Sequence, residues 1–176
     1  FTADPSIFSI LNLNQKAPYV FLRFVSWNAN HDIGQSGLSL KAKRLLVSKL
    51  KNHFNVFISS EGVLPEDLEK FRIKIPAHKM HDVLASASLF IGEGATMASE
   101  CAMLGTPAIY VNSLDAGTLK EQEKLGLIFG FRNSLGVMEK VDELLANKNL
   151  KIDFALKKDK MVKALVDPTA MLVEYL

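Results

Sequence analysis

The stretch from Gly92 to Pro107 carries the clearest chemical signal in this sequence. Gly92 and Gly94 permit a tight turn between a strand and a helix, and they allow a ligand to approach the backbone closely. The helix that follows presents free N–H groups and the positive end of its dipole, which both favour an anion. Thr96 adds a hydroxyl group beside Ala95. We therefore predict that Gly92, Gly94, Ala95 and Thr96 hold the phosphates of a nucleotide or a nucleotide sugar.

Glu100 is the next candidate binding residue, one helical turn beyond Thr96 at i+4. Its carboxylate is a hydrogen-bond acceptor that suits the hydroxyl groups of a ribose. Taken alone, such a residue is more often a solvated helix carboxylate, and two glycines before a helix are also ordinary turn chemistry. It is the spacing of all these residues together that favours the binding interpretation.

Polar side chains follow four of the predicted strands. They occur in the segments Ser26–Asp32, Ser59–Glu61, Gly92–Thr96 and Asn112–Ser113. Because ligands of an open parallel sheet bind beyond the carboxyl ends of its strands, these segments predict one shared pocket. Asn112 and Ser113 are expected to contribute to ligand binding there. The alternative is that these loops are polar only because loops generally are.

Four residues are candidates for catalysis: His31, Asp32, Glu61 and Glu93. His31 suits a general acid or base, or a partner of a sugar phosphate, but a loop histidine bonded to backbone is an equal alternative. Glu61 and Glu93 are suited to proton transfer in an epimerase-like reaction. In a phosphate site they would instead repel the ligand unless a metal or a basic group lay between. Both interpretations stay open.

No metal or cofactor is expected, apart from the nucleotide-sugar ligand itself. His78 and His81 have an i, i+3 spacing that can hold a metal, but no third ligand is evident nearby. A surface pair is the simpler interpretation. The single cysteine, Cys101, is expected to be a small packed side chain.

Composition excludes several classes of protein. The chain has 176 residues, is 48% hydrophobic and 23% charged, and carries a net charge of +2. This is ordinary for one globular domain, and its scattered lysines do not form the basic stripe of a nucleic-acid binder. No run reaches the roughly 18 apolar residues of a membrane span, and no signal peptide is visible. We therefore expect a cytoplasmic protein without nucleic-acid partners, and a fragment, since the chain does not begin with Met.

Short apolar runs alternate with helical periods along the chain, which predicts an α/β fold. Strands are expected at 19–25, 55–59, 72–75, 89–91, 107–111 and 127–129. Helices are expected after Asp4-Pro5 and after Ser39, after Pro65, from Met80 to Ala87, from Ala95 to Leu104, and at 118–125, 135–145, 154–165 and 168–175. Right-handed crossovers then place helices on both faces of a parallel sheet. The predicted architecture is a Rossmann-like three-layer α/β/α sandwich over residues 1–176.

The order of these elements resembles the C-terminal domain of GT-B glycosyltransferases. The resemblance rests on the helix Met80–Ala87, the strand Leu89–Ile91, Gly94-Ala95-Thr96, Glu100, and Leu104-Gly105-Thr106-Pro107 before a strand. The pattern is similar to MurG-type N-acetylglucosaminyltransferases and to UDP-N-acetylglucosamine 2-epimerases. Over its whole length the chain resembles an uncharacterised domain-of-unknown-function family with a GT-B-like fold. That broader resemblance rests on the segments 26–32, 57–62 and 90–97.

The resemblance implies roles for several residues. Gly94, Ala95 and Thr96 would hold the diphosphate of a UDP-sugar-like ligand, Glu100 would bind ribose hydroxyls, and the backbone near Ile75–His78 would face the base. It also implies that the chain is the C-terminal half of a two-domain protein, whose N-terminal domain carries the acceptor site. Such a half is expected to be inactive alone.

Three functions remain as hypotheses. The first is a nucleotide-sugar-binding domain of a GT-B-like glycosyltransferase or UDP-sugar epimerase. The second is a non-catalytic binding or interaction module that retains the half-fold. The third, an enzyme with a nicotinamide cofactor, is disfavoured because no G-x-G-x-x-G follows the first strand.

Overall fold

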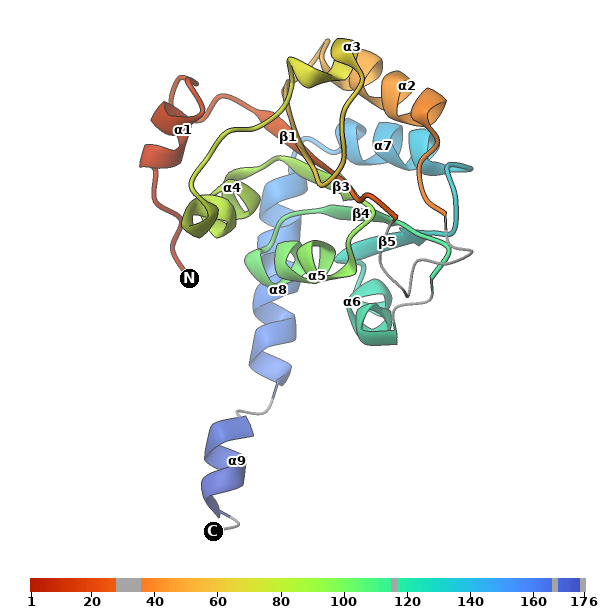
Figure 1. Ribbon diagram of the computed structural model, residues 1–176. Helices are drawn as coiled ribbons and strands as arrows, with labels where there is room; N and C mark the ends of the chain where they lie inside the picture. Colours follow the sequence, from red (N-terminus) through yellow and green to blue (C-terminus); the bar gives the residue numbers. More distant parts are fainter. Residues whose placement is uncertain (28–35, 115–116, 166–167, 175–176) are drawn as a thin grey trace.

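The computed structural model describes residues 1–27, 36–114, 117–165 and 168–174. They contain a five-stranded parallel sheet with the strand order β2-β1-β3-β4-β5. The strands are β1 (Tyr19–Phe24), β2 (Asn55–Ser60), β3 (Leu89–Gly92), β4 (Ala108–Val111) and β5 (Ile128–Phe131). Helices α2 (Leu40–Leu50) and α7 (Val137–Ala146) cover one face, and α4 (Met80–Ser86), α5 (Ala95–Leu104) and α6 (Lys120–Lys124) cover the other (Figure 1). The predicted Rossmann-like α/β/α sandwich is confirmed.

The remaining helices lie outside these two layers. They are α1 (Ser6–Ile10), α3 (Glu66–Glu69), α8 (Leu150–Ala164), α9 (Pro168–Glu174) and the single 3₁₀ turns η2 (Ala77–Lys79) and η3 (Gly117–Leu119). Helix α8 runs away from the body of the domain toward the C-terminus (Figure 1). No helix of the described residues is long and apolar enough to cross a membrane.

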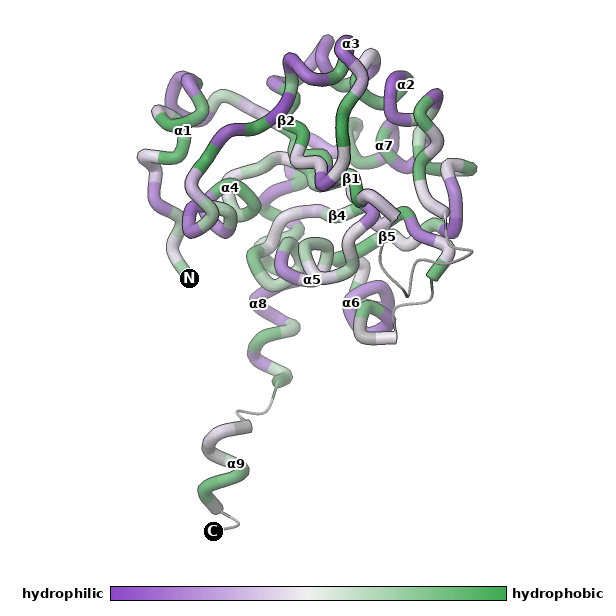
Figure 2. Tube along the Cα trace, viewed as in Figure 1, coloured by the Kyte–Doolittle hydropathy of each residue, from purple (hydrophilic) through white to green (hydrophobic). Residues whose placement is uncertain are grey.

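Apolar residues concentrate along the central strands, whereas α2 mixes hydrophilic and hydrophobic residues and α6 is hydrophilic throughout (Figure 2). All four residues of β3 and of β4 are buried. This continuous burial is expected when helices cover both faces of a parallel sheet. The largest fully buried side chains include Tyr19, Phe21, Phe24, Phe90, Leu22, Leu84, Leu89 and Ile91. The core therefore lies directly beneath the strand ends that carry the candidate site.

Local signals in the sequence fix the ends of two helices that matter for the site. The Ser39 side chain accepts a hydrogen bond from the Ala42 N–H and so caps α2, as predicted. Helix α5 spans Ala95–Leu104 as predicted, and Gly105 ends it with a φ of 75°. A residue with a Cβ is strained in that left-handed conformation, so glycine is favoured there.

The predicted strand at 72–75 is wrong. Only one isolated bridge, between Ile58 and Arg72, joins this segment to β2. The Arg72 guanidinium donates hydrogen bonds to the carbonyls of Ser60 and Gly62 and to the Glu69 carboxylate. Its side chain therefore turns back over the preceding loop. Pro76, which has no N–H to donate, follows directly. The alternating pattern of 72–75 reflects partial packing on the core, without a ladder of hydrogen bonds.

Lys151 fixes the first turn of α8 to the edge of the domain. Its ammonium group donates to the carbonyls of Ala85 and Ala87, at 2.9 and 2.8 Å, and to the Thr106 hydroxyl at 3.0 Å. Although the side chain as a whole is exposed, these contacts shield the ammonium from water, and this desolvation lowers the pKa of Lys151 to about 8. Lys151 is thus a structural residue whose charge depends on pH.

We expect Lys151→Met to lower the free energy of unfolding by about 1–3 kcal/mol at pH 7, since three acceptors lose their donor. Because the folded-state pKa lies below the ordinary value of 10.5, the unfolded chain binds more protons between about pH 8 and 10.5. The stability of the wild-type protein should therefore rise with pH across that window, by about 1–2 kcal/mol once solvent screening is allowed for.

Urea unfolding at pH 7 and at pH 10 measures both effects. The Lys157→Met variant is the matched control, because Lys157 lies at the surface of the same helix and donates to one carbonyl, that of Gly126. A Lys151→Met variant with the same pH dependence as the wild type would show that another group causes the change.

Candidate functional site

The strand order reverses its direction between β1 and β3. The chain leaves β1 toward β2 on one side, and later leaves β3 toward β4 on the other, so these neighbouring strands form a switch point. Ligands of open α/β sheets bind at such a point. The exits of β1, β2, β3 and β4 all carry predicted site residues, and the structure brings these exits to one edge of the sheet.

The turn between β3 and α5 has the form that the sequence predicts. Gly92 ends β3, and Gly94 precedes α5 in an extended conformation, with no side chain capping the helix. The first helical hydrogen bond of this turn joins the Ala98 N–H to the Gly94 carbonyl. The N–H groups of the first helical residues therefore have no acceptor within the helix and are suited to an anion.

Three of the predicted binding residues, Ala95, Thr96 and Glu100, line one cavity of about 520 Å³ that runs along the side of α5. Ser99, Met103, Leu104, His81 and Phe1 complete its lining. Glu100 lies 3.5 Å from the His81 imidazole, measured from Oε1 to Nε2, and its side chain is 35% exposed. The cavity thus combines hydroxyl groups and a carboxylate with an apolar wall.

Sequence reasoning missed most of the other residues in this cavity. Ser99 and Met103 lie at i+3 and i+7 from Thr96, so helical periodicity could have placed them on the same face. The i, i+3 spacing of His78 and His81 points to a metal site or, more simply, to a surface pair, so it does not place His81 in this cavity. The contact of His81 with Glu100 depends on the packing of α4 against α5, which a local pattern does not encode.

Glu61 lies at the exit of β2 and pairs with Arg23, a residue of β1 that the sequence analysis did not single out. Arg23 also donates to the Ser59 hydroxyl at 2.7 Å. The second oxygen of Glu61 accepts from the Ser26 N–H at 3.3 Å. Because the Glu61 side chain is 44% exposed, its carboxylate remains open to solvent beyond the strand ends.

Glu93 is completely buried at the switch point, and its side chain has 0% exposure. Its carboxylate accepts hydrogen bonds from the Val25 N–H at 2.9 Å, the Leu38 N–H at 2.8 Å and the Lys43 ammonium at 3.1 Å. Burial raises the pKa of Glu93, and Lys43 together with the two backbone groups opposes that rise. These contacts give Glu93 a structural role between the exits of β1 and β3, and its catalytic role stays a prediction.

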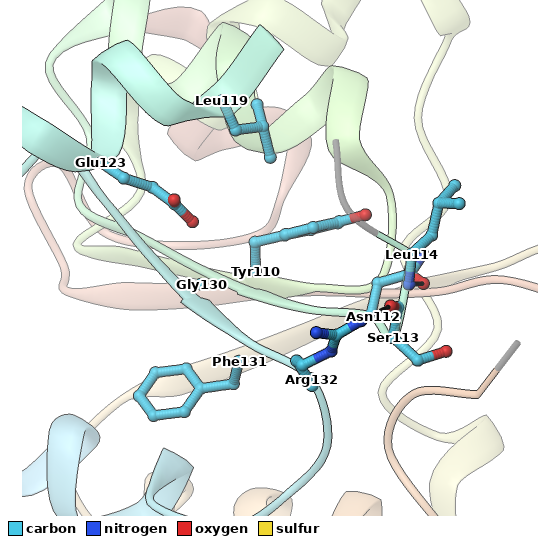
Figure 3. A pocket seen from close by; sticks show the side chains of 9 residues that line it. All are labelled: Tyr110, Asn112, Ser113, Leu114, Leu119, Glu123, Gly130, Phe131 and Arg132. Atoms are coloured by element: carbon cyan, nitrogen blue, oxygen red, sulfur yellow. Dashed lines mark hydrogen bonds between the residues drawn. The ribbon is translucent and has the colours of Figure 1, made fainter. Parts of the chain in front are cut away.

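Asn112 and Ser113 line a second, smaller cavity of about 200 Å³ at the ends of β4 and β5 (Figure 3). Asn112 also donates from its side chain to the Glu93 carbonyl at 3.1 Å and accepts from the Leu114 N–H at 2.8 Å. It therefore ties the turn before α5 to the loop after β4. The Ser113 hydroxyl accepts from the Ser36 N–H at 2.9 Å.

His31 and Asp32 lie outside the described residues, so the structure does not place them. The described residues contain no group of three histidine, cysteine or carboxylate side chains that could hold a metal. Cys101 is free and fully buried, as the sequence predicts.

Comparisons with known proteins identify the type of fold, through solved structures and not through sequence. No family model and no curated protein matches the sequence. Among solved structures, a putative UDP-N-acetylglucosamine 2-epimerase from Listeria monocytogenes matches with a TM-score of 0.54 at 13% identity, over 88% of this chain and 42% of that one. The fold is therefore GT-B-like, as the resemblance implied.

Two further structures have the same fold. The UDP-GlcNAc 2-epimerase from Neisseria meningitidis matches with a TM-score of 0.58 at 13% identity, over 90% of this chain and 46% of that one. The spinosyn rhamnosyltransferase SpnG matches with a TM-score of 0.59 at 13% identity, over 92% of this chain and 46% of that one. The chain thus spans less than half the length of each of these three structures.

Proposed function

We propose that this domain binds a nucleotide sugar of the UDP-sugar type, as one half of a GT-B-like glycosyltransferase or sugar epimerase. The observation that carries the proposal is the cavity along α5, which Ala95, Thr96 and Glu100 line together. The structures that share this fold include a UDP-GlcNAc 2-epimerase bound to UDP-GlcNAc, which matches over 90% of this chain. No metal is needed for the mechanism proposed below.

The diphosphate would lie at the first turn of α5. The free N–H groups of this turn and the Thr96 hydroxyl are hydrogen-bond donors, and the helix dipole adds a positive potential. Donors that are fixed in place before the reaction stabilise the charge that develops on a departing diphosphate. Helix α5 is held firmly for this purpose, since Ala98, Cys101 and Ala102 are buried against the sheet.

The nucleoside would lie along the side of α5. The Glu100 carboxylate would accept hydrogen bonds from the ribose hydroxyls, and this requires His81 to share or release its contact with Glu100. The backbone near Ile75–His78, which leads into η2 and α4, would face the base. The cavity volume of about 520 Å³ is within the range of small-molecule sites.

The chemistry would take place beyond the exits of β1 and β2. Glu61 is the predicted proton-transfer group that is open to solvent there, and Arg23 holds it in position. We propose that His31 and Asp32 act from the loop after β1, and that a second domain supplies the acceptor side. The proposal includes a cytoplasmic location, with which the free Cys101 is compatible.

The alternative is a binding or interaction module without catalysis. It is favoured by the contacts that the two predicted catalytic glutamates make. Glu93 is fully buried and bonded, and Glu61 is paired with Arg23. Both residues would then serve the fold, and the GT-B-like half would only bind.

Calorimetric titration of UDP and UDP-N-acetylglucosamine into the domain tests the proposal. We expect Glu100→Ala to weaken binding at least about tenfold, because hydrogen bonds to a charged group are lost. Glu139→Ala is the matched control, since Glu139 is an exposed residue of α7, which covers the other face of the sheet. Equal binding by all three proteins would contradict the assignment of the ribose to Glu100. Absence of binding to the wild-type domain would favour the module.

A further inference from the structure

The smaller cavity, at the ends of β4 and β5, has the form of a second binding site (Figure 3). Its floor is the paired residues Tyr110 and Gly130 of adjacent strands. Leu119 and Glu123 contribute from η3 and α6, and Leu114 and Arg132 lie toward the strand ends. Its volume of about 200 Å³ limits it to a small ligand.

Gly130 makes room for the Glu123 carboxylate in this cavity. A Cβ at Gly130 would occupy the place of the Glu123 Oε1 atom. The backbone itself does not demand glycine, because Gly130 is not among the residues with a positive φ. A glycine inside a strand weakens the strand and often marks a close approach by another group. Here it allows a carboxylate to lie over the sheet.

Two opposite charges line the cavity without neutralising each other. Within the described ranges, the Glu123 carboxylate has no ion pair or hydrogen bond, and the Arg132 guanidinium has only a contact of 3.4 Å with the Ser113 carbonyl. The two side chains form no ion pair with each other, so their charged atoms lie more than 4.0 Å apart. Along β5, positions 130 and 132 are separated by about 7 Å. The cavity therefore offers separate sites for a cation and an anion, with apolar walls between them.

We propose that this cavity binds a small dipolar ion in which an ammonium and a carboxylate are joined by a short carbon chain, as in an ω-amino acid. The ammonium would contact Glu123, and the carboxylate would contact the Arg132 guanidinium, whose fork suits two parallel hydrogen bonds. The carbon chain would lie against Tyr110 and Leu119. The proposal is independent of nucleotide binding, since none of these residues lines the cavity at α5.

Titration by two-dimensional NMR, with γ-aminobutyrate and ε-aminocaproate as probes, tests the proposal. We expect saturable shifts of the backbone amides at residues 110–113 and 130–132. Butylamine and butyrate each carry one of the two charges, and we expect them to bind at least about tenfold more weakly. Glucose is the uncharged control. Absence of shifts with both amino acids, or equal binding by butylamine, butyrate or glucose, would overturn the proposal.

Three variants separate the two charges from the fold. Glu123→Gln and Arg132→Gln should each weaken amino-acid binding at least about tenfold. Glu121→Gln should change it less than about twofold, because Glu121 pairs with Lys124 on the surface of the same helix. Gly130→Ala should also abolish binding, since the new methyl group displaces the carboxylate. If Glu121→Gln and Glu123→Gln weakened binding equally, general surface charge would explain the result and the proposal would fail.

Discussion

Replacing Glu93 with alanine is expected to lower the free energy of unfolding by about 3–5 kcal/mol, the range for breaking a buried charge pair. The substitution removes the acceptor of the Val25 N–H, the Leu38 N–H and the Lys43 ammonium together. Lys43 is only 14% exposed, so its charge would remain poorly solvated. Unfolding in urea, followed by circular dichroism, measures the loss.

Glu61→Ala is the matched comparison, because it removes a carboxylate that follows a strand but is 44% exposed. We expect this variant to lose no more than about 1 kcal/mol, as is usual for surface ion pairs. A second variant, Lys43→Met, tests the cause. It should also destabilise the protein, because it leaves the buried Glu93 carboxylate without its charged partner. Equal stability of the Glu93→Ala and Glu61→Ala variants would contradict the structural role of Glu93.

Gly92→Ala is expected to lower the free energy of unfolding by about 1–3 kcal/mol, the range for overpacking a core. A Cβ at Gly92 would lie 2.5 Å from the Phe90 ring and 2.9 Å from the Arg23 Cβ. Phe90 is fully buried and cannot move without disturbing its neighbours. Thermal unfolding of the wild type and the variant, side by side, measures this change.

Gly94→Ala is the control, since its Cβ would meet only the Arg23 Cγ, at 3.9 Å, and its backbone has a negative φ. We expect the stability of this variant to remain within about 0.5 kcal/mol of the wild type. The two glycines would then differ in purpose: Gly92 is needed for packing, and Gly94 leaves the approach to α5 open. A larger loss for Gly94→Ala than for Gly92→Ala would reverse that assignment.

The sequence predicts the sheet and most helices because their signals are local. Helix α5 has the predicted bounds because Gly94 and Gly105 flank it, and α2 begins where Ser39 can cap it. The strands are recognised because each is a short run rich in apolar residues, and β1, β3 and β4 are buried along almost their whole length. The prediction fails for the segment 72–75. Its alternation of polar and apolar residues is typical of a strand, but the Arg72 side chain donates to the carbonyls of Ser60 and Gly62 in the preceding loop.

The candidate site is predicted less completely, because burial depends on residues distant in the sequence. Glu61 and Glu93 both follow strands and look alike in sequence, yet only Glu93 is enclosed, by Val25, Leu38 and Lys43. Asn112 is predicted to bind ligand. Its side chain donates to the Glu93 carbonyl and accepts from the Leu114 N–H, and it lines the smaller cavity at the ends of β4 and β5. Arg23 and Glu123 were missed because a charged residue in a strand or a polar helix carries no local signal.

The strand order also affects how the chain folds, because the interior strand β1 pairs with one strand that is near in the chain and one that is distant. In the middle of the sheet, Val20 of β1 pairs with Leu89 of β3, whereas its other partner, Val56 of β2, is much nearer in the chain. Closing the longer loop costs more entropy, so contacts of this kind slow folding. Until β3 arrives, one edge of β1 is open, and its residues Val20, Phe21 and Leu22 are strongly apolar. During synthesis, a nascent chain that ends before residue 89 therefore exposes an edge that is prone to aggregation.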